Sequence, residues 1–183
     1  MRVVISVFLV IFLFLGTIFG TFTAVVDLNS VVNRKFGNVE LQMTKRSSLI
    51  EDMVRYLSLQ SPDDKPLYEQ VSYLSERMSV ARSVSQIDTA NQNLVSAVNF
   101  LVVLVEKNPR FAKDSMLKDM LHDLKKSESM FLLARTEYND SVREFNDKLV
   151  TFPFSLVASS LEYHPKELFS VEDRVELLPS VSF

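Results

Sequence analysis

The residue pair that comes closest to a catalytic or metal-binding motif in this chain is Asp119 and His122. Their i, i+3 spacing occurs in helical di-iron sites, but those sites combine two such pairs with further inward-facing glutamates. The only other histidine is His164, and the chain has no cysteine. Its 3 glycines fit neither a phosphate-binding loop nor a dinucleotide fingerprint. We therefore expect no metal site, no cofactor and no enzymatic activity.

Three charged residues interrupt helix faces that are otherwise apolar. Arg46 lies in one such face, and Glu128 and Arg135 lie in another. A charge at such a position is costly unless it is paired or its stem lets the head reach water. If the two helices are antiparallel, with Phe152 near the level of Val26, Arg46 is level with about residue 132. We predict a structural polar layer of Arg46, Glu128 and Arg135 that fixes the helix register, and solvent exposure of the Arg46 head is the alternative.

The composition favours a helical protein. The sequence is 47% hydrophobic with only 3 Gly and 6 Pro, which suits long helices better than a sheet rich in turns. A net charge of -3 provides no basic surface for phosphates. We predict an all-α fold and do not expect nucleic acid as a partner.

The elements that must position these residues follow from the apolar periodicity and the helix breakers. We predict an elongated antiparallel four-helix bundle with helices at about residues 27–60, 66–83, 86–107 and 115–152. The two middle helices separate if Ser85 and Asp88 form a capping box, and otherwise they make one kinked helix in a three-long-helix bundle. Asp114 is the expected N-cap of the last helix, and Pro153 is expected to end it.

An uncharged apolar stretch covers residues 3–26, between Arg2 and Asp27. As a helix it is roughly 36 Å long, enough to cross a hydrocarbon core of about 30 Å. The apolar region of a cleaved signal peptide is shorter, about 7 to 15 residues. We predict a retained single-pass transmembrane anchor in the cell membrane, with the lipid bilayer as partner through residues 3–26. Positive residues flank the stretch on both sides, Arg2 before it and Arg34 and Lys35 after it, so the side of the soluble domain stays open.

Residues 153–183 are predicted to form a short amphipathic segment and a C-terminal tail. Phe154, Leu156, Val157 and Leu161 give the first part an apolar character. Two roles are open for it, since it could lie in the membrane interface or cap the end of the bundle core.

The run of residues 128–158 carries a family likeness. It reads E-x-x-F-x-x-A-R-x-x-Y-N-x-x-V-x-x-F-N-x-x-L-x-x-F-P-x-x-L-V-A and resembles the C-terminal signature of the LemA family. Its signature positions are Tyr138, Asn139, Phe145, Asn146, Phe152 and Pro153. Residues 36–54 and the closing residues 179–183 resemble two further segments of that family. The sequence departs from the family pattern at Phe36, where Trp is usual, and at Ser159 and Ser160, where a Gly-rich stretch is usual.

The resemblance implies one N-terminal membrane helix, a four-helix bundle and no established molecular activity. We therefore expect a non-enzymatic, membrane-anchored scaffold that binds protein partners or a second copy of itself. The alternative is a membrane-tethered sensor whose bundle accepts a small apolar ligand.

Overall fold

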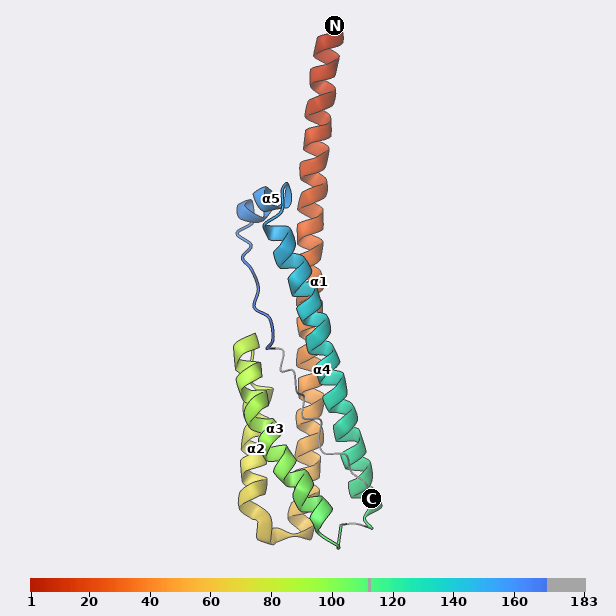
Figure 1. Ribbon diagram of the computed structural model, residues 1–183, viewed down its shortest axis with the longest axis vertical. Helices are drawn as coiled ribbons and strands as arrows, with labels where there is room; N and C mark the ends of the chain where they lie inside the picture. Colours follow the sequence, from red (N-terminus) through yellow and green to blue (C-terminus); the bar gives the residue numbers. More distant parts are fainter. Residues whose placement is uncertain (112, 171–183) are drawn as a thin grey trace. The chain divides into compact units, whose positions relative to one another are not determined.

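A computed structural model describes residues 1–111 and 113–170, with the backbone alone at residues 2, 3 and 10. All regular structure in these residues is helical, which confirms the predicted all-α class. The elements are α1 (Arg2–Gln60), the 3₁₀ helix η1 (Pro62–Asp64), α2 (Lys65–Ser79), α3 (Val84–Lys107), α4 (Ser115–Leu149) and α5 (Phe154–Ser160) (Figure 1). The chain forms two compact units: the first unit is Met1–Gly37 with Thr136–Leu168, and the second unit is Asn38–Arg135 with the described residues from Phe169.

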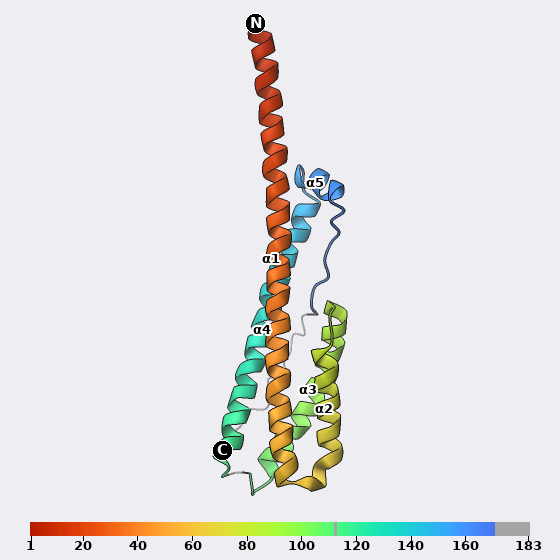
Figure 2. The ribbon, with the colours of Figure 1, turned by 180° about the vertical axis from the view of Figure 1, so that it is seen from behind.

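Helix α1 is one continuous helix that contains both the apolar stretch and the predicted helix after it. No proline occurs before Pro62, so nothing in the sequence removes a helical hydrogen bond along this length. From Val4 to Phe19, the large apolar side chains whose burial the structure describes are 40% to 76% exposed. Figure 2 shows this part of α1 without a neighbouring helix. Its length and its apolar composition are sufficient for α1 to cross a membrane.

In the second unit, α2 and α3 are separate helices that form an antiparallel pair (Figure 1). The alternative of one kinked helix is therefore wrong. The predicted capping box at Ser85 and Asp88 is also wrong, because the cap lies two residues earlier. The Gln86 amide donates to Ser83 Oγ at 3.2 Å, and the Arg82 amide donates to Gln86 Oε1 at 3.0 Å. The carboxylate of Asp88 is instead used by partners outside α3.

Helix α4 begins at the predicted cap, where the Leu117 amide donates to Asp114 Oδ1 at 3.1 Å. It ends at Leu149, three residues before the predicted end at 152, because the Thr151 amide turns back to Lys148 O at 3.1 Å. A helix that continued to residue 152 would include Phe152, but the early turn leaves this side chain outside the helix and 74% exposed. The apolar face of α4 is buried at Phe131, Tyr138, Val142, Phe145 and Leu149.

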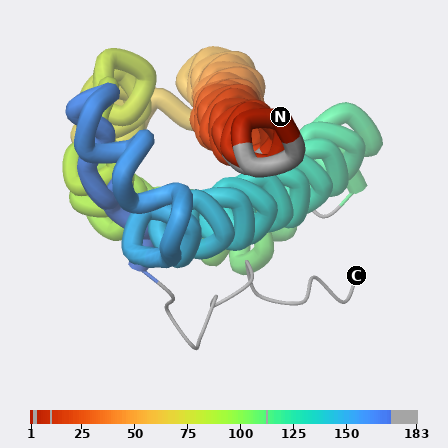
Figure 3. Tube along the Cα trace, turned by 90° about the horizontal axis from the view of Figure 1, so that it is seen from above, coloured from red at the N-terminus to blue at the C-terminus, as the bar shows by residue number. Residues whose placement is uncertain are grey.

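In the first unit, two contacts set an antiparallel register between α1 and α4. Lys35 Nζ lies 2.8 Å from Glu137 Oε2, and the rings of Phe36 and Tyr138 are 5.6 Å apart. This register places position 152 level with about residue 21, more than one helical turn from the predicted level at residue 26. The last turns of α4 and α5 lie to one side of α1 (Figure 3).

Candidate functional site

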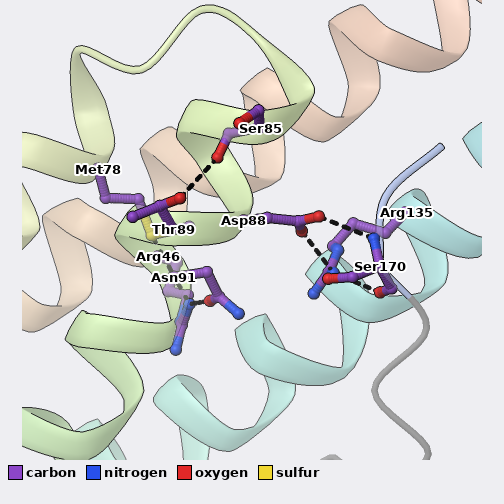
Figure 4. A network of polar contacts seen from close by, with 8 residues as sticks. All are labelled: Arg46, Met78, Ser85, Asp88, Thr89, Asn91, Arg135 and Ser170. Carbon is purple, nitrogen blue, oxygen red and sulfur yellow. Dashed lines mark hydrogen bonds and ion pairs between the residues drawn. The ribbon is translucent and has the colours of Figure 1, made fainter. Parts of the chain in front are cut away.

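The most buried charge in the second unit is the guanidinium of Arg46, whose residue is 1% exposed. Its Nη2 forms an ion pair with Glu128 Oε2 at 2.5 Å, and its Nη1 donates to Asn91 Oδ1 at 2.6 Å. Figure 4 shows Arg46 beside Asn91 and Met78. The Phe131 ring lies 5.7 Å from the guanidinium carbon. The alternative in which the Arg46 head reaches solvent is therefore wrong.

Burial is the main electrostatic influence on this arginine. It lowers the pKa of Arg46, the negative charge of Glu128 opposes that effect, and the positive charge of Arg135 adds to it. A guanidinium starts from so high a pKa that it keeps its proton at neutral pH even when it is buried. Arg46 is therefore a permanent positive charge inside the unit, and it needs the Glu128 carboxylate.

Arg135 does not share the carboxylate of Glu128, in contrast to the predicted layer. Its Nη2 lies 2.8 Å from Asp88 Oδ1 and donates to Ser170 O at 2.9 Å. The Ser170 amide donates to Asp88 Oδ2 at 2.7 Å, which closes a ring of contacts (Figure 4). The Phe169 ring covers the Arg135 guanidinium at 5.2 Å. Arg135 thus holds Phe169 and Ser170 against α3.

The two arginine clusters are neighbours, because one aromatic ring separates them. Arg135 lies 5.6 Å from the Phe131 ring, about as close as Arg46 does. The structure thus brings Arg46 and Glu128 together and gives Arg135 a carboxylate of its own. Sequence reasoning missed Asp88 and Asn91, the two α3 side chains in these clusters. Each is a polar residue within an amphipathic helix, and nothing local distinguishes it from a solvated one.

The signature residues of α4 hold an extended segment, the strap, residues 163–168. Asn146 makes two hydrogen bonds with the backbone of Lys166: its Oδ1 accepts from the amide and its Nδ2 donates to the carbonyl, both at 2.9 Å. Tyr138 Oη donates to Glu167 O at 3.1 Å. An extended segment outside a sheet has no ladder to satisfy its backbone groups, so these side chains supply the partners.

Aromatic contacts complete the attachment of the strap in the first unit. The rings of Phe145 and Tyr163 meet edge to face at 5.8 Å, and Asn29 Nδ2 lies 3.5 Å from Tyr163 Oη. Burial raises the pKa of the Tyr138 phenol, and the nearby charge of Glu167 adds to the shift. The hydroxyl therefore stays protonated as a donor at neutral pH.

The remaining signature positions have different surroundings. Asn139 is buried in α4, Pro153 is half-buried, and Phe152 is exposed. The sequence marked Asn146 only as a signature position and did not predict its contact with the backbone of Lys166.

These clusters offer little access to a substrate. Arg46 and Arg135 are 1% and 8% exposed, and each faces a carboxylate of the same unit. Within residues 1–111 and 113–170, no group of three His, Cys, Asp or Glu side chains could hold a metal ion. His122 is exposed on α4. A hollow of about 570 Å³ between α2 and α3, lined by residues such as Tyr73 and Val80, opens to the surface.

A comparison with protein-family models matches residues 35–183 to the LemA family. The chain belongs to the LemA family. The LemA match includes both arginine clusters and the strap, and it begins after the apolar stretch of residues 3–26. No curated protein sequence matches the chain significantly. The LemA-like residues 179–183 lie outside the described residues.

Proposed function

We propose that this LemA-family protein is a non-enzymatic scaffold, held in the cell membrane by one helix over residues 3–26, that binds protein partners or a second copy of itself. The observation that carries the proposal is the use of its buried polar groups. Arg46, Asp88, Glu128 and Arg135 are engaged with one another, with Asn91 or with the backbone of Ser170. Buried charges that are paired within the protein support a rigid binding platform better than a reaction centre.

The anchor part of the proposal is supported by the free apolar surface of α1. Large apolar side chains from Val4 to Phe19 are exposed all along the helix, and water would solvate such a surface poorly. The apolar stretch of residues 3–26 is long enough to cross a bilayer. A reporter domain fused after Phe183 would determine on which side of the membrane the soluble part lies.

Crosslinking in native membranes tests the scaffold. A lysine-reactive reagent applied to membranes that contain the full chain should give discrete larger species, each with one defined partner or a second copy. The control repeats the reaction after dilution in detergent, where random collisions no longer give products but a specific complex persists. A lone monomer under both conditions would contradict the scaffold. An enclosed apolar cavity with a bound small molecule would favour the sensor instead.

A further inference from the structure

The end of the first unit that lies next to the free part of α1 has an exposed apolar surface. Val150 is 79% exposed, Phe152 is 74% exposed and Leu156 is 61% exposed. On the other face of α5, Val157 and Ala158 are buried. Helix α5 therefore packs one face into the unit. Its other face and the turn between α4 and α5 present large apolar side chains to the outside. We call Val150, Phe152 and Leu156 the collar.

The collar lies level with the end of the apolar stretch of α1. The contacts of Lys35 with Glu137 and of Phe36 with Tyr138 set the antiparallel register. In that register, the end of α4 at Leu149 is level with roughly residue 24 of α1, and the collar follows directly after it. Thr21 and Val25 are 6% and 1% exposed, so α1 gains cover from the rest of its unit at this level. The collar is thus beside the last turns of the stretch that would be in the bilayer.

The polarity of the unit changes in steps from the collar toward the strap. Beyond the collar, the Tyr163 hydroxyl contacts Asn29, which lies three residues past the apolar stretch of α1. A further step along, Lys166 Nζ donates to Asn33 Oδ1 at 3.1 Å. Apolar, then amphipathic aromatic, then charged groups are the sequence of layers across a membrane interface, where tyrosines favour the headgroup level. This order favours lipid over a protein surface as the occupant of the collar.

A lysine at the edge of the collar fits the same arrangement. Lys148 is half-buried, and its Nζ lies 4.8 Å from the Phe154 ring. A lysine at this level can extend its ammonium to lipid phosphates, since its flexible stem lets the charge move from the ring toward the headgroups. Three apolar side chains bind a bilayer weakly on their own, but an anchor in the same chain makes their insertion an intramolecular step.

We propose that helix α5 and the turn that connects α4 to it lie in the membrane interface, with Val150, Phe152 and Leu156 in contact with lipid acyl chains. The inference rests on the proposed anchoring of residues 3–26. It assigns the C-terminal end of α4 to the bilayer surface and leaves the second unit for partners.

The chain contains no tryptophan, so single-tryptophan variants report on one position each. Three exposed phenylalanines allow matched substitutions in the full chain: Phe152→Trp in the collar, Phe12→Trp in the anchor and Phe100→Trp in the second unit. Phe12 and Phe100 are 76% and 69% exposed, close to the value for Phe152. Each variant is reconstituted in phosphatidylcholine vesicles with or without bromine atoms on the upper acyl chain, which quench nearby tryptophan emission.

We expect strong bromine quenching of Phe152→Trp and Phe12→Trp and several-fold weaker quenching of Phe100→Trp. A second reporter, Leu156→Trp, should behave as Phe152→Trp does. Quenching of the Phe152 variant no greater than that of the Phe100 variant, with the Phe12 variant quenched, would overturn the collar and leave the anchor intact. An unquenched Phe12 variant would overturn the anchor and the collar together. A blue-shifted but unquenched Phe152 variant would mean that protein covers the collar, which also overturns the inference.

Discussion

Removal of one member of the buried ion pair at a time should have unequal effects on stability. The Arg46 side chain is 1% exposed and that of Glu128 is 10% exposed. Glu128→Leu leaves a buried guanidinium that cannot lose its proton, with only Asn91 as hydrogen-bond partner among oxygen acceptors. Arg46→Met leaves a carboxylate whose side chain is 10% exposed and therefore has some access to water.

The magnitudes follow from these two situations. Breaking a buried pair at the carboxylate strands the cation and costs about 3–5 kcal/mol at any pH near neutral. Arg46→Met leaves a carboxylate that is partly exposed to water, which costs less than a stranded charge that is fully buried, so the loss for Arg46→Met should be smaller than that for Glu128→Leu. For a chain of this size the Glu128→Leu loss is a fall in Tm of about 6–20 °C.

Thermal and urea unfolding of the full chain in detergent at pH 7, followed by circular dichroism, would measure these effects. The double variant should recover most of the loss caused by Glu128→Leu, because no charge is then left unpaired. Arg55→Met is the matched control, since Arg55 is 74% exposed in a surface pair with Asp52 and should change stability by less than about 1 kcal/mol. Equal losses for the two single variants would refute the reasoning.

Three further predictions concern single contacts. Asn146→Ala removes both hydrogen bonds to the backbone of Lys166, so it should cost about 2 kcal/mol and speed amide hydrogen exchange in the strap, with α2 and α3 unchanged. Tyr56 Oη donates to Asp114 Oδ2 at 2.6 Å, and this bond is the largest cause that lowers the pKa of Asp114. The resulting stability is present above the unfolded-state pKa of about 3.9 and is lost as pH falls through the folded value, so Tyr56→Phe should flatten the acid limb of a urea-unfolding pH series. Ser83→Ala removes the cap of α3 and should lower the unfolding free energy by about 1 kcal/mol, and no change in the urea midpoint would contradict the cap.

Apolar periodicity was enough to predict the helices, because each buried face repeats in steps of three and four. The same reasoning placed Arg46 level with about residue 132, roughly one turn from its partner Glu128, because the two helices were taken as antiparallel. Local patterns could not choose between Ser83 and Ser85 as the cap, as either is followed three residues later by a suitable side chain. The choice depends on Asp88, whose partners Arg135 and Ser170 lie far along the chain.

The strap was not predicted, because its conformation has no period of its own. Residues 163–168 are extended and depend on α4 for their hydrogen bonds. Asn146 was recognised as a signature residue, but the sequence does not reveal which backbone it meets. The exposure of Phe152 was missed for a related reason, since the turn that ends α4 at Leu149 is set by the path the chain takes into α5.

The way in which Asn146 holds the strap has a consequence for which positions can vary. The contact uses the amide and the carbonyl of position 166, and these atoms are the same in every residue except proline, which lacks the N–H. A side-chain amide that both donates and accepts at this reach is specific to asparagine at position 146. Sequence freedom is thus divided unevenly across this one contact: position 166 can accept any residue except proline without loss of these two hydrogen bonds, whereas position 146 cannot change its asparagine.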